Sequence, residues 1–282
     1  MSWQEIGSRV LEYTIEAAVS SGIILSFFGC FLLLAALLQL VTLSLRRRWY
    51  GVLGERSWIM LAAPGTIIHE TGHALFCLLF RHRIREMKLF SPTPEGTLGM
   101  VSHSWDPGSF YQRAGNFFIG TGPIITGVAA IVLLTRLLMP EIWDELDLPA
   151  LYSLSDLGAA LLSLLCRMIR SFCTSEVWYK WQTWVWLLAT LLIGSHITLS
   201  REDLKNAVTG IWIIPAVILL FNLAIIWHSN PGKLLLEYGS GYLVCTLAIL
   251  IFIILILGSF TLLLHLPLFQ PAAPEKKSPR RK

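Results

Sequence analysis

The chain has 282 residues, of which 55% are hydrophobic and only 14% are charged. A soluble globular domain has about a quarter of its residues charged, so this sequence lacks the polar side chains that cover a water-exposed surface. The net charge of +4 is too small to indicate a nucleic-acid partner, and we expect none. The composition predicts an integral membrane protein surrounded by the lipid bilayer.

A helix needs about 20 residues to cross a bilayer. Five apolar stretches meet this length, at about residues 21–45, 57–80, 115–138, 180–199 and 241–264. A sixth, residues 211–228, is shorter, and residues 148–170 carry charges that favour an amphipathic helix in the membrane interface. The third stretch is rich in glycine, which favours close helix packing in lipid. We expect an all-α polytopic membrane protein with about six transmembrane helices, with seven as the alternative count.

The distribution of lysine and arginine indicates the orientation, because cytoplasmic loops of membrane proteins are enriched in basic residues. Placing both termini in the cytoplasm puts more of these residues inside than outside, although Arg46, Arg47 and Arg48 fall outside. We expect residues 1–270 to form one transmembrane domain in the cell membrane. The basic, proline-rich tail at residues 271–282 is expected to be disordered and cytoplasmic.

One predicted cytoplasmic loop has the pattern of a β-hairpin directly after the second apolar stretch. Residues 84–90 have strand character, residues 91–96 have the composition of a turn, and residues 97–105 form a candidate return strand. We therefore expect a short β-hairpin here. Its open edge offers a pairing partner to an extended peptide.

The second apolar stretch contains the motif His69-Glu70-Thr71-Gly72-His73. Two histidines four residues apart lie on one face of a helix, about 6 Å apart along its axis, so both imidazoles reach one tetrahedral zinc ion. Glu70 then lies beside the remaining, water-occupied position, where it accepts a proton from the metal-bound water. Ionisable residues are costly within a membrane helix, which argues against a chance match. The motif predicts a Zn²⁺ site with Glu70 as the catalytic base.

A third zinc ligand has to come from another segment, and two residues near the end of the fourth apolar stretch are chemically suitable. One is His196, whose alternative explanation is an interfacial histidine at a helix end. The other is Asp203, which also fits a capping box that starts at Ser200; the two roles are compatible. Asp203 lies beyond the apolar residues, whereas the two histidines are within them. Either the chain after Ser195 folds back toward the histidines, or His196 is the ligand.

Together these features resemble the site-2 protease family of intramembrane zinc metalloproteases. In that family the third ligand lies in an N-x-x-P-x-x-x-L-D-G pattern. Aligning Asp203 with the aspartate puts Ser195 at the asparagine position, and the proline and the D-G pair are missing here. The family's glycine-rich span carries A-G-P-x-x-N, which this chain matches at Gly122 and Pro123, with Thr126 at the asparagine position.

The resemblance covers about residues 57–205. It implies a zinc metalloendopeptidase that hydrolyses peptide bonds of membrane-embedded protein substrates, with Glu70 activating a zinc-bound water. It also favours Asp203 over His196, because the spacing from Ser195 is the family's asparagine-to-aspartate spacing. The predicted metal ligands are His69, His73 and Asp203.

Two other classes of function are compatible with these residues. One is a non-proteolytic, zinc-binding membrane scaffold or chaperone, although zinc binding alone does not require Glu70. The other is a metal or proton transporter, which usually shows paired internal repeats that we do not find in this sequence. The sequence makes no prediction of the oligomeric state.

Overall fold

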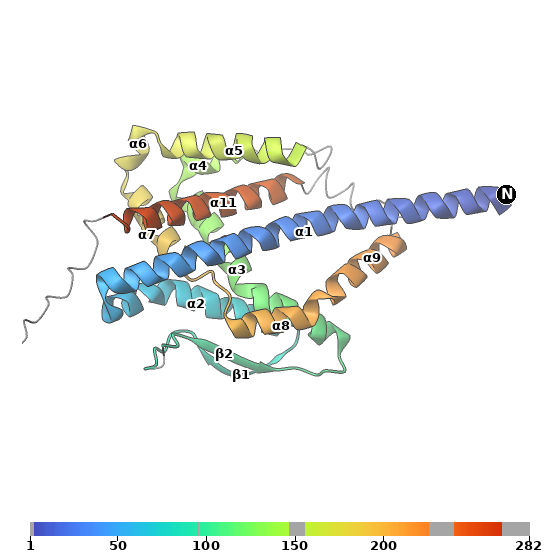
Figure 1. The fold of residues 1–282 in the computed structure, drawn as a ribbon, viewed down its shortest axis with the longest axis horizontal. Coiled ribbons are helices and arrows are strands. Elements are labelled where there is room, and N and C mark those ends of the chain that lie inside the picture. The colour runs from blue at the N-terminus through green and yellow to red at the C-terminus, as the bar shows by residue number, and fades with distance from the viewer. Residues whose placement is uncertain (1–2, 95, 147–155, 226–239, 267–282) are drawn as a thin grey trace, which may run out of the picture.

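The computed structural model describes residues 3–94, 96–146, 156–225 and 240–266 (Figure 1). These residues are mostly helical and include one small antiparallel sheet. In chain order the elements are α1 (Trp3–Leu53), α2 (Glu55–Leu79), β1 (Arg83–Lys88), β2 (Met100–Ser104), α3 (Phe110–Leu138), α4 (Pro140–Trp143), α5 (Asp156–Phe172), α6 (Ser175–Trp178), α7 (Trp181–Gly194), α8 (Arg201–Ile211), α9 (Ile213–Ile225) and α11 (Ser240–Leu263). The predicted tail at 271–282 lies outside the described residues.

Among the described residues, three helical segments are long and apolar enough to cross a membrane, which indicates that the chain is a membrane protein. They are Phe110–Leu138 in α3, Arg201–Ala224 across α8 and α9, and Val244–Leu263 in α11. Helices suit this environment because they satisfy their own backbone hydrogen bonds where no water is present. The three segments correspond to three of the six predicted stretches.

The other three predicted stretches also fall on helices. Residues 21–45 lie within α1, and residues 57–80 coincide with most of α2. Residues 180–199 overlap α7, which is apolar but has only 14 residues. α7 is shorter than predicted because the chain leaves the helix after Gly194 and continues without regular structure to Ser200. The number of six spans remains a prediction.

The hairpin predicted after the second apolar stretch is present. β1 and β2 pair in antiparallel fashion, with Arg83 opposite Ser104 and Lys88 opposite Met100. The strands are shorter than predicted because the connecting residues form a wider loop, in which the Ser91 N–H donates to the carbonyl oxygen of Leu98 at 2.7 Å. The hairpin lies along one side of the helices, where both strands contact α2 (Figure 1).

α3 packs against both α2 and α8, and glycines allow both approaches. A Cβ atom on Gly72 of α2 would lie 2.8 Å from the carbonyl carbon of Gly122 in α3. A Cβ atom on Gly120 would lie 2.4 Å from the carbonyl oxygen of Asp203 in α8. The predicted role of the third-stretch glycines in close helix packing is confirmed at Gly120 and at Gly122, where a Cβ atom would lie 2.9 Å from the carbonyl oxygen of Gly72. As a result, α2 and α8 meet at the same part of α3.

Candidate metal centre

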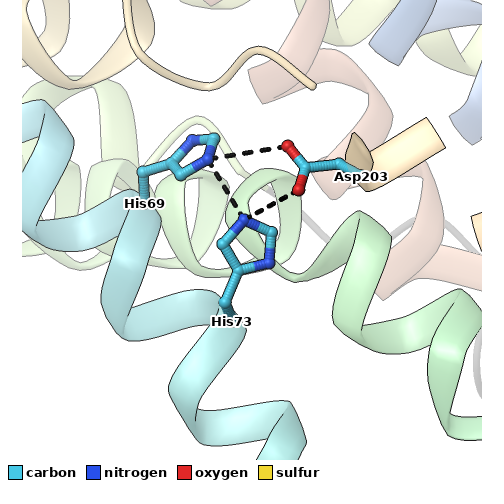
Figure 2. A group of neighbouring side chains, drawn as sticks. All are labelled: His69, His73 and Asp203. Atoms are coloured by element: carbon cyan, nitrogen blue, oxygen red, sulfur yellow. Dashed lines mark hydrogen bonds and ion pairs between the residues drawn. The ribbon is translucent and has the colours of Figure 1, made fainter. Parts of the chain in front are cut away.

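Two histidines of α2 and one aspartate of α8 converge on a single point (Figure 2). The Nε2 atoms of His69 and His73 are 3.2 Å apart, because these residues are separated by one helical turn. The Nε2 atom of His73 lies 3.2 Å from Oδ1 of Asp203, and that of His69 lies 3.8 Å from Oδ2. All candidate ligand atoms lie within 4.8 Å of one another. The structure thus brings together the three residues predicted as metal ligands.

Backbone carbonyl groups fix the orientation of both imidazoles. Nδ1 of His69 lies 2.9 Å from the carbonyl oxygen of His196, and Nδ1 of His73 lies 2.8 Å from that of Ile119. A carbonyl oxygen only accepts hydrogen bonds, so each Nδ1 carries the proton and donates it. Each Nε2 is then left with a lone pair, and both lone pairs face Asp203. This is the arrangement that metal-binding histidines adopt in proteins.

The donor set fits a metal ion. With both imidazoles neutral and protonated on Nδ1, two Nε2 lone pairs and a carboxylate oxygen are three hydrogen-bond acceptors at close range. Such a group repels itself unless a cation lies between its members. Two imidazole nitrogens and one carboxylate oxygen form a common catalytic zinc set, and they suit other divalent transition metals as well. His69, His73 and Asp203 are therefore placed to hold a metal ion.

Asp203 has two roles, as the sequence analysis allowed. Its Oδ2 atom accepts a hydrogen bond from the Ser200 N–H at 2.7 Å, and the Asp203 N–H donates to Oγ of Ser200 at 3.1 Å. These two bonds form the predicted capping box at the start of α8. The other carboxylate oxygen, Oδ1, faces His73. The helix cap uses Oδ2, so Oδ1 is the oxygen atom left to face a metal ion.

The apparent mismatch in depth is removed by the chain between α7 and α8. Residues 197–200 are not helical, and they lead the chain into α8 so that Asp203 is buried against α3. The side-chain amide of Gln39 in α1 fixes this segment. Its Oε1 accepts from the Leu199 N–H at 2.7 Å, and its Nε2 donates to the Leu199 carbonyl oxygen at 3.1 Å. Residues 197–200 thus form the non-helical segment that the first of the two predicted alternatives requires.

His196 lies next to the centre but its ring is not part of it. The ring stacks on Trp58 with centroids 5.3 Å apart, and its Nδ1 lies 3.0 Å from the carbonyl oxygen of Leu192. Its Nε2 is buried without a hydrogen-bond partner among the described residues. His196 contributes to the centre through its backbone carbonyl, which holds His69. Sequence patterns report side chains, so this role had no signal in the sequence.

Glu70 is buried and lines a cavity beside the metal-binding group. The cavity has a volume of about 510 Å³ and also exposes His69. Its other walls come from α1, from the loop between the two strands, and from residues 198–201. A Cβ atom on Gly99 would lie 2.7 Å from Cγ of Glu70, so the hairpin loop lies directly against this side chain. The volume is in the usual range for ligand sites and admits water and part of a peptide.

Two further histidines, His82 and His103, pair at the base of the hairpin. Nδ1 of His82 lies 3.1 Å from Nδ1 of His103, and Nε2 of His82 lies 2.8 Å from the carbonyl oxygen of Gln112. Burial, followed by the charges of His82 and His73, lowers the pKa of His103 to about 4. Burial also lowers the pKa of His82. Both rings are therefore neutral at pH 7, and they connect β2 to the start of α3.

No family model, curated protein or solved structure matches this chain. The chemistry of the site is therefore argued from its geometry.

Proposed function

We propose that this protein is an intramembrane zinc metalloprotease, similar to the site-2 protease family, that cleaves membrane-embedded protein substrates. One observation carries the proposal: His69, His73 and Asp203 converge within 4.8 Å beside a cavity that also contains the carboxylate of Glu70. A metal-holding group alone also fits a scaffold or a transporter. A carboxylate in the same cavity that is not itself a member of the metal-holding group is what a hydrolase requires.

The residues of the site have distinct tasks in this proposal. Zinc held by His69, His73 and Asp203 would polarise the scissile carbonyl group and make water more acidic. Glu70 acts as the general base, taking a proton from the attacking water and passing it to the amine of the leaving group. The carbonyl oxygens of His196 and Ile119 hold the two imidazoles in place throughout.

The substrate has to unwind before it is cut. A transmembrane helix has no free backbone groups, so a stretch of the substrate must leave the helical state before its carbonyl carbon is accessible. β1 and β2 each have an open edge, and the loop between them lines the cavity. The unwound stretch adds to one of these edges as a further strand. With both termini in the cytoplasm, cleavage takes place on the cytoplasmic side of the cell membrane.

The test separates metal binding from proteolysis. Glu70→Gln removes the base but leaves all three proposed ligands, so the purified variant should keep its full zinc content. Co-expressed with a panel of single-span reporter proteins, the parent should cleave at least one reporter, and the variant none. Equal cleavage by parent and variant would exclude Glu70 as the base.

Two further outcomes identify the rival functions. A parent protein that retains zinc but cleaves no reporter in the panel would favour a zinc-binding scaffold or chaperone. Zinc or proton flux into liposomes that contain the parent, and its loss in the His69→Ala, His73→Ala double variant, would favour a transporter.

A further inference from the structure

Arg46 of α1 lines the cavity that contains His69 and Glu70. Gln39 and Leu43 of the same helix line it too, and the spacing of four and then three residues places all three on one helical face. Arg46 is partly buried, whereas the next residue, Arg47, is exposed. The C-terminal part of α1 therefore directs one guanidinium group, out of a run of three arginines, into the candidate active site.

The guanidinium group of Arg46 has no counter-ion. It makes no ion pair and no hydrogen bond with any residue in the part of the chain that the structure describes. Its guanidinium carbon, Cζ, lies 5.9 Å from the centroid of the Trp58 ring. Trp58 stacks in turn on the buried ring of His196, so this contact holds Arg46 in a fixed place. An arginine that is kept beside apolar helices without a partner is costly, and such residues usually serve a ligand.

The chemistry of the cavity selects an anion as that ligand. A guanidinium group presents a planar fork of N–H donors that matches a carboxylate with two parallel hydrogen bonds. Arg201 lines the same cavity and adds a second positive charge. Among the described residues, neither nearby carboxylate pairs with Arg46. Asp203 directs its oxygen atoms to Ser200 and His73, and Glu70, which lines the same cavity, forms no ion pair with it.

We propose that Arg46 is a specificity-determining residue that binds a carboxylate of the peptide substrate beside the scissile bond. The inference rests on the proposed function, because Glu70 acts on a peptide that lies in this same cavity. The carboxylate belongs either to an acidic side chain close to the cleavage site or to the C-terminus of the peptide. Both present the same two oxygen atoms to Arg46.

Binding to a full-length, zinc-loaded Glu70→Gln protein in neutral detergent tests the inference without cleavage. The probes are three apolar peptides with a neutral fluorescent label: one with a central glutamate and an amidated C-terminus, its glutamine twin, and the glutamine twin with a free C-terminus. A charged hydrogen-bonded pair predicts that at least one carboxylate peptide binds about tenfold or more tightly than the uncharged twin. The peptide that shows the gain identifies the source of the carboxylate.

Variants at neighbouring arginines decide whether Arg46 is responsible. Arg46→Gln should abolish the preference for the carboxylate, and Arg46→Lys should keep part of it, because the charge remains while the fork is lost. Arg47→Gln, in the same helix but exposed, should behave as the parent. Zinc content equal to that of the parent shows that each variant is folded.

Three results would overturn the inference. The Glu70→Gln protein could show no preference for a carboxylate peptide, or this preference could survive when Arg46→Gln is added. The third result is Arg46-dependent binding of short-chain phosphatidylglycerol in place of the glutamate peptide. Failure of the proposed function looks different. A carboxylate preference in the Glu70→Gln protein, together with a parent that never cleaves, would leave Arg46 as a binding residue and remove the protease. Cleavage by the unsubstituted protein, without a preference for carboxylate peptides in the binding assay, would keep the protease and remove the role of Arg46.

Discussion

Ser200 and Asp203 each accept a hydrogen bond from the backbone N–H of the other, and this pair positions the carboxylate that faces the two histidines. A residue that caps a helix therefore also holds a candidate metal ligand in place. The stability of the first turn of α8 and the affinity for the metal are thereby linked.

The first prediction follows from this link. Ser200→Ala removes one bond of the capping box, which should cost about 1 kcal/mol of helix stability. Because Asp203 loses part of its support, zinc affinity should also fall, by about tenfold or more. Competition with a chromogenic chelator measures the affinity. Thr209→Ala, an exposed hydroxyl near the other end of α8, serves as the control and should leave zinc binding unchanged.

The second prediction distinguishes the two candidate third ligands. Asp203→Asn keeps an oxygen that can accept the Ser200 N–H, so the helix cap should survive while the anionic ligand is lost. Its zinc content should fall well below that of the parent. His196→Phe keeps both the stacking on Trp58 and the backbone carbonyl that holds His69, so it should retain zinc. Elemental analysis that finds zinc in Asp203→Asn and none in His196→Phe would reverse the assignment.

The third prediction concerns helix packing. Gly120→Ala would place a Cβ atom 2.4 Å from the carbonyl oxygen of Asp203, so α8 has to move away from α3. Overpacking of this kind costs about 1–3 kcal/mol. We expect a lower melting temperature and weaker zinc binding with unchanged helix content by circular dichroism. The matched control is Gly258→Ala in α11, where a Cβ atom would meet nothing within 4 Å; it should differ from the parent in neither measurement.

The fourth prediction is a pH dependence of the hairpin. The pKa of His103 is lowered to about 4 in the folded protein, against an ordinary value of 6.5, so folding favours its neutral form. The stability that depends on neutral His103 is fully present above pH 6.5 and is lost as the pH falls from 6.5 toward 4. Amide hydrogen exchange in β2 should therefore lose protection over this range.

A variant checks that the imidazole pair causes this change. His103→Gln cannot acquire a charge at this position, so β2, corrected for the intrinsic effect of pH on exchange, should lose less protection between pH 6.5 and 4 than the parent does. The dependence that remains comes from His82, whose pKa is also lowered by burial. A variant that loses as much protection as the parent would assign the effect to other groups. The readout is confined to Met100–Ser104, the residues of β2.

Part of the site could be predicted from the sequence because it depends on local periodicity. His69 and His73 share a helical face by spacing alone, and the capping box of Asp203 is a short-range pattern. The hairpin could likewise be predicted, because two stretches with strand character flank a turn within residues 84–105. Its wider loop was not, because the loop conformation depends on Gly99 packing against Glu70.

The remaining parts depend on contacts between residues far apart in the chain. Asp203 reaches the histidines because Gln39, 160 positions before Leu199, holds the intervening segment, and because Gly120 admits α8. Neither contact has a signature in a single sequence. Arg46 appeared in the sequence only as one of three arginines on the unexpected side of the membrane. Its place in the cavity offers a reason for that exception that has nothing to do with orientation.

The two hydrogen bonds between Gln39 and Leu199 also limit where an incoming peptide finds backbone partners. Both main-chain groups of Leu199 are already occupied, so the cavity wall formed by this residue presents no free amide for strand pairing. The outer edges of β1 and β2, in contrast, pair with no further strand among the described residues. An extended peptide that entered the cavity would thus bind through its backbone on the hairpin side. On the α1 side it would be recognised through its side chains. This difference between the two walls fixes the orientation in which an extended peptide lies in the cavity.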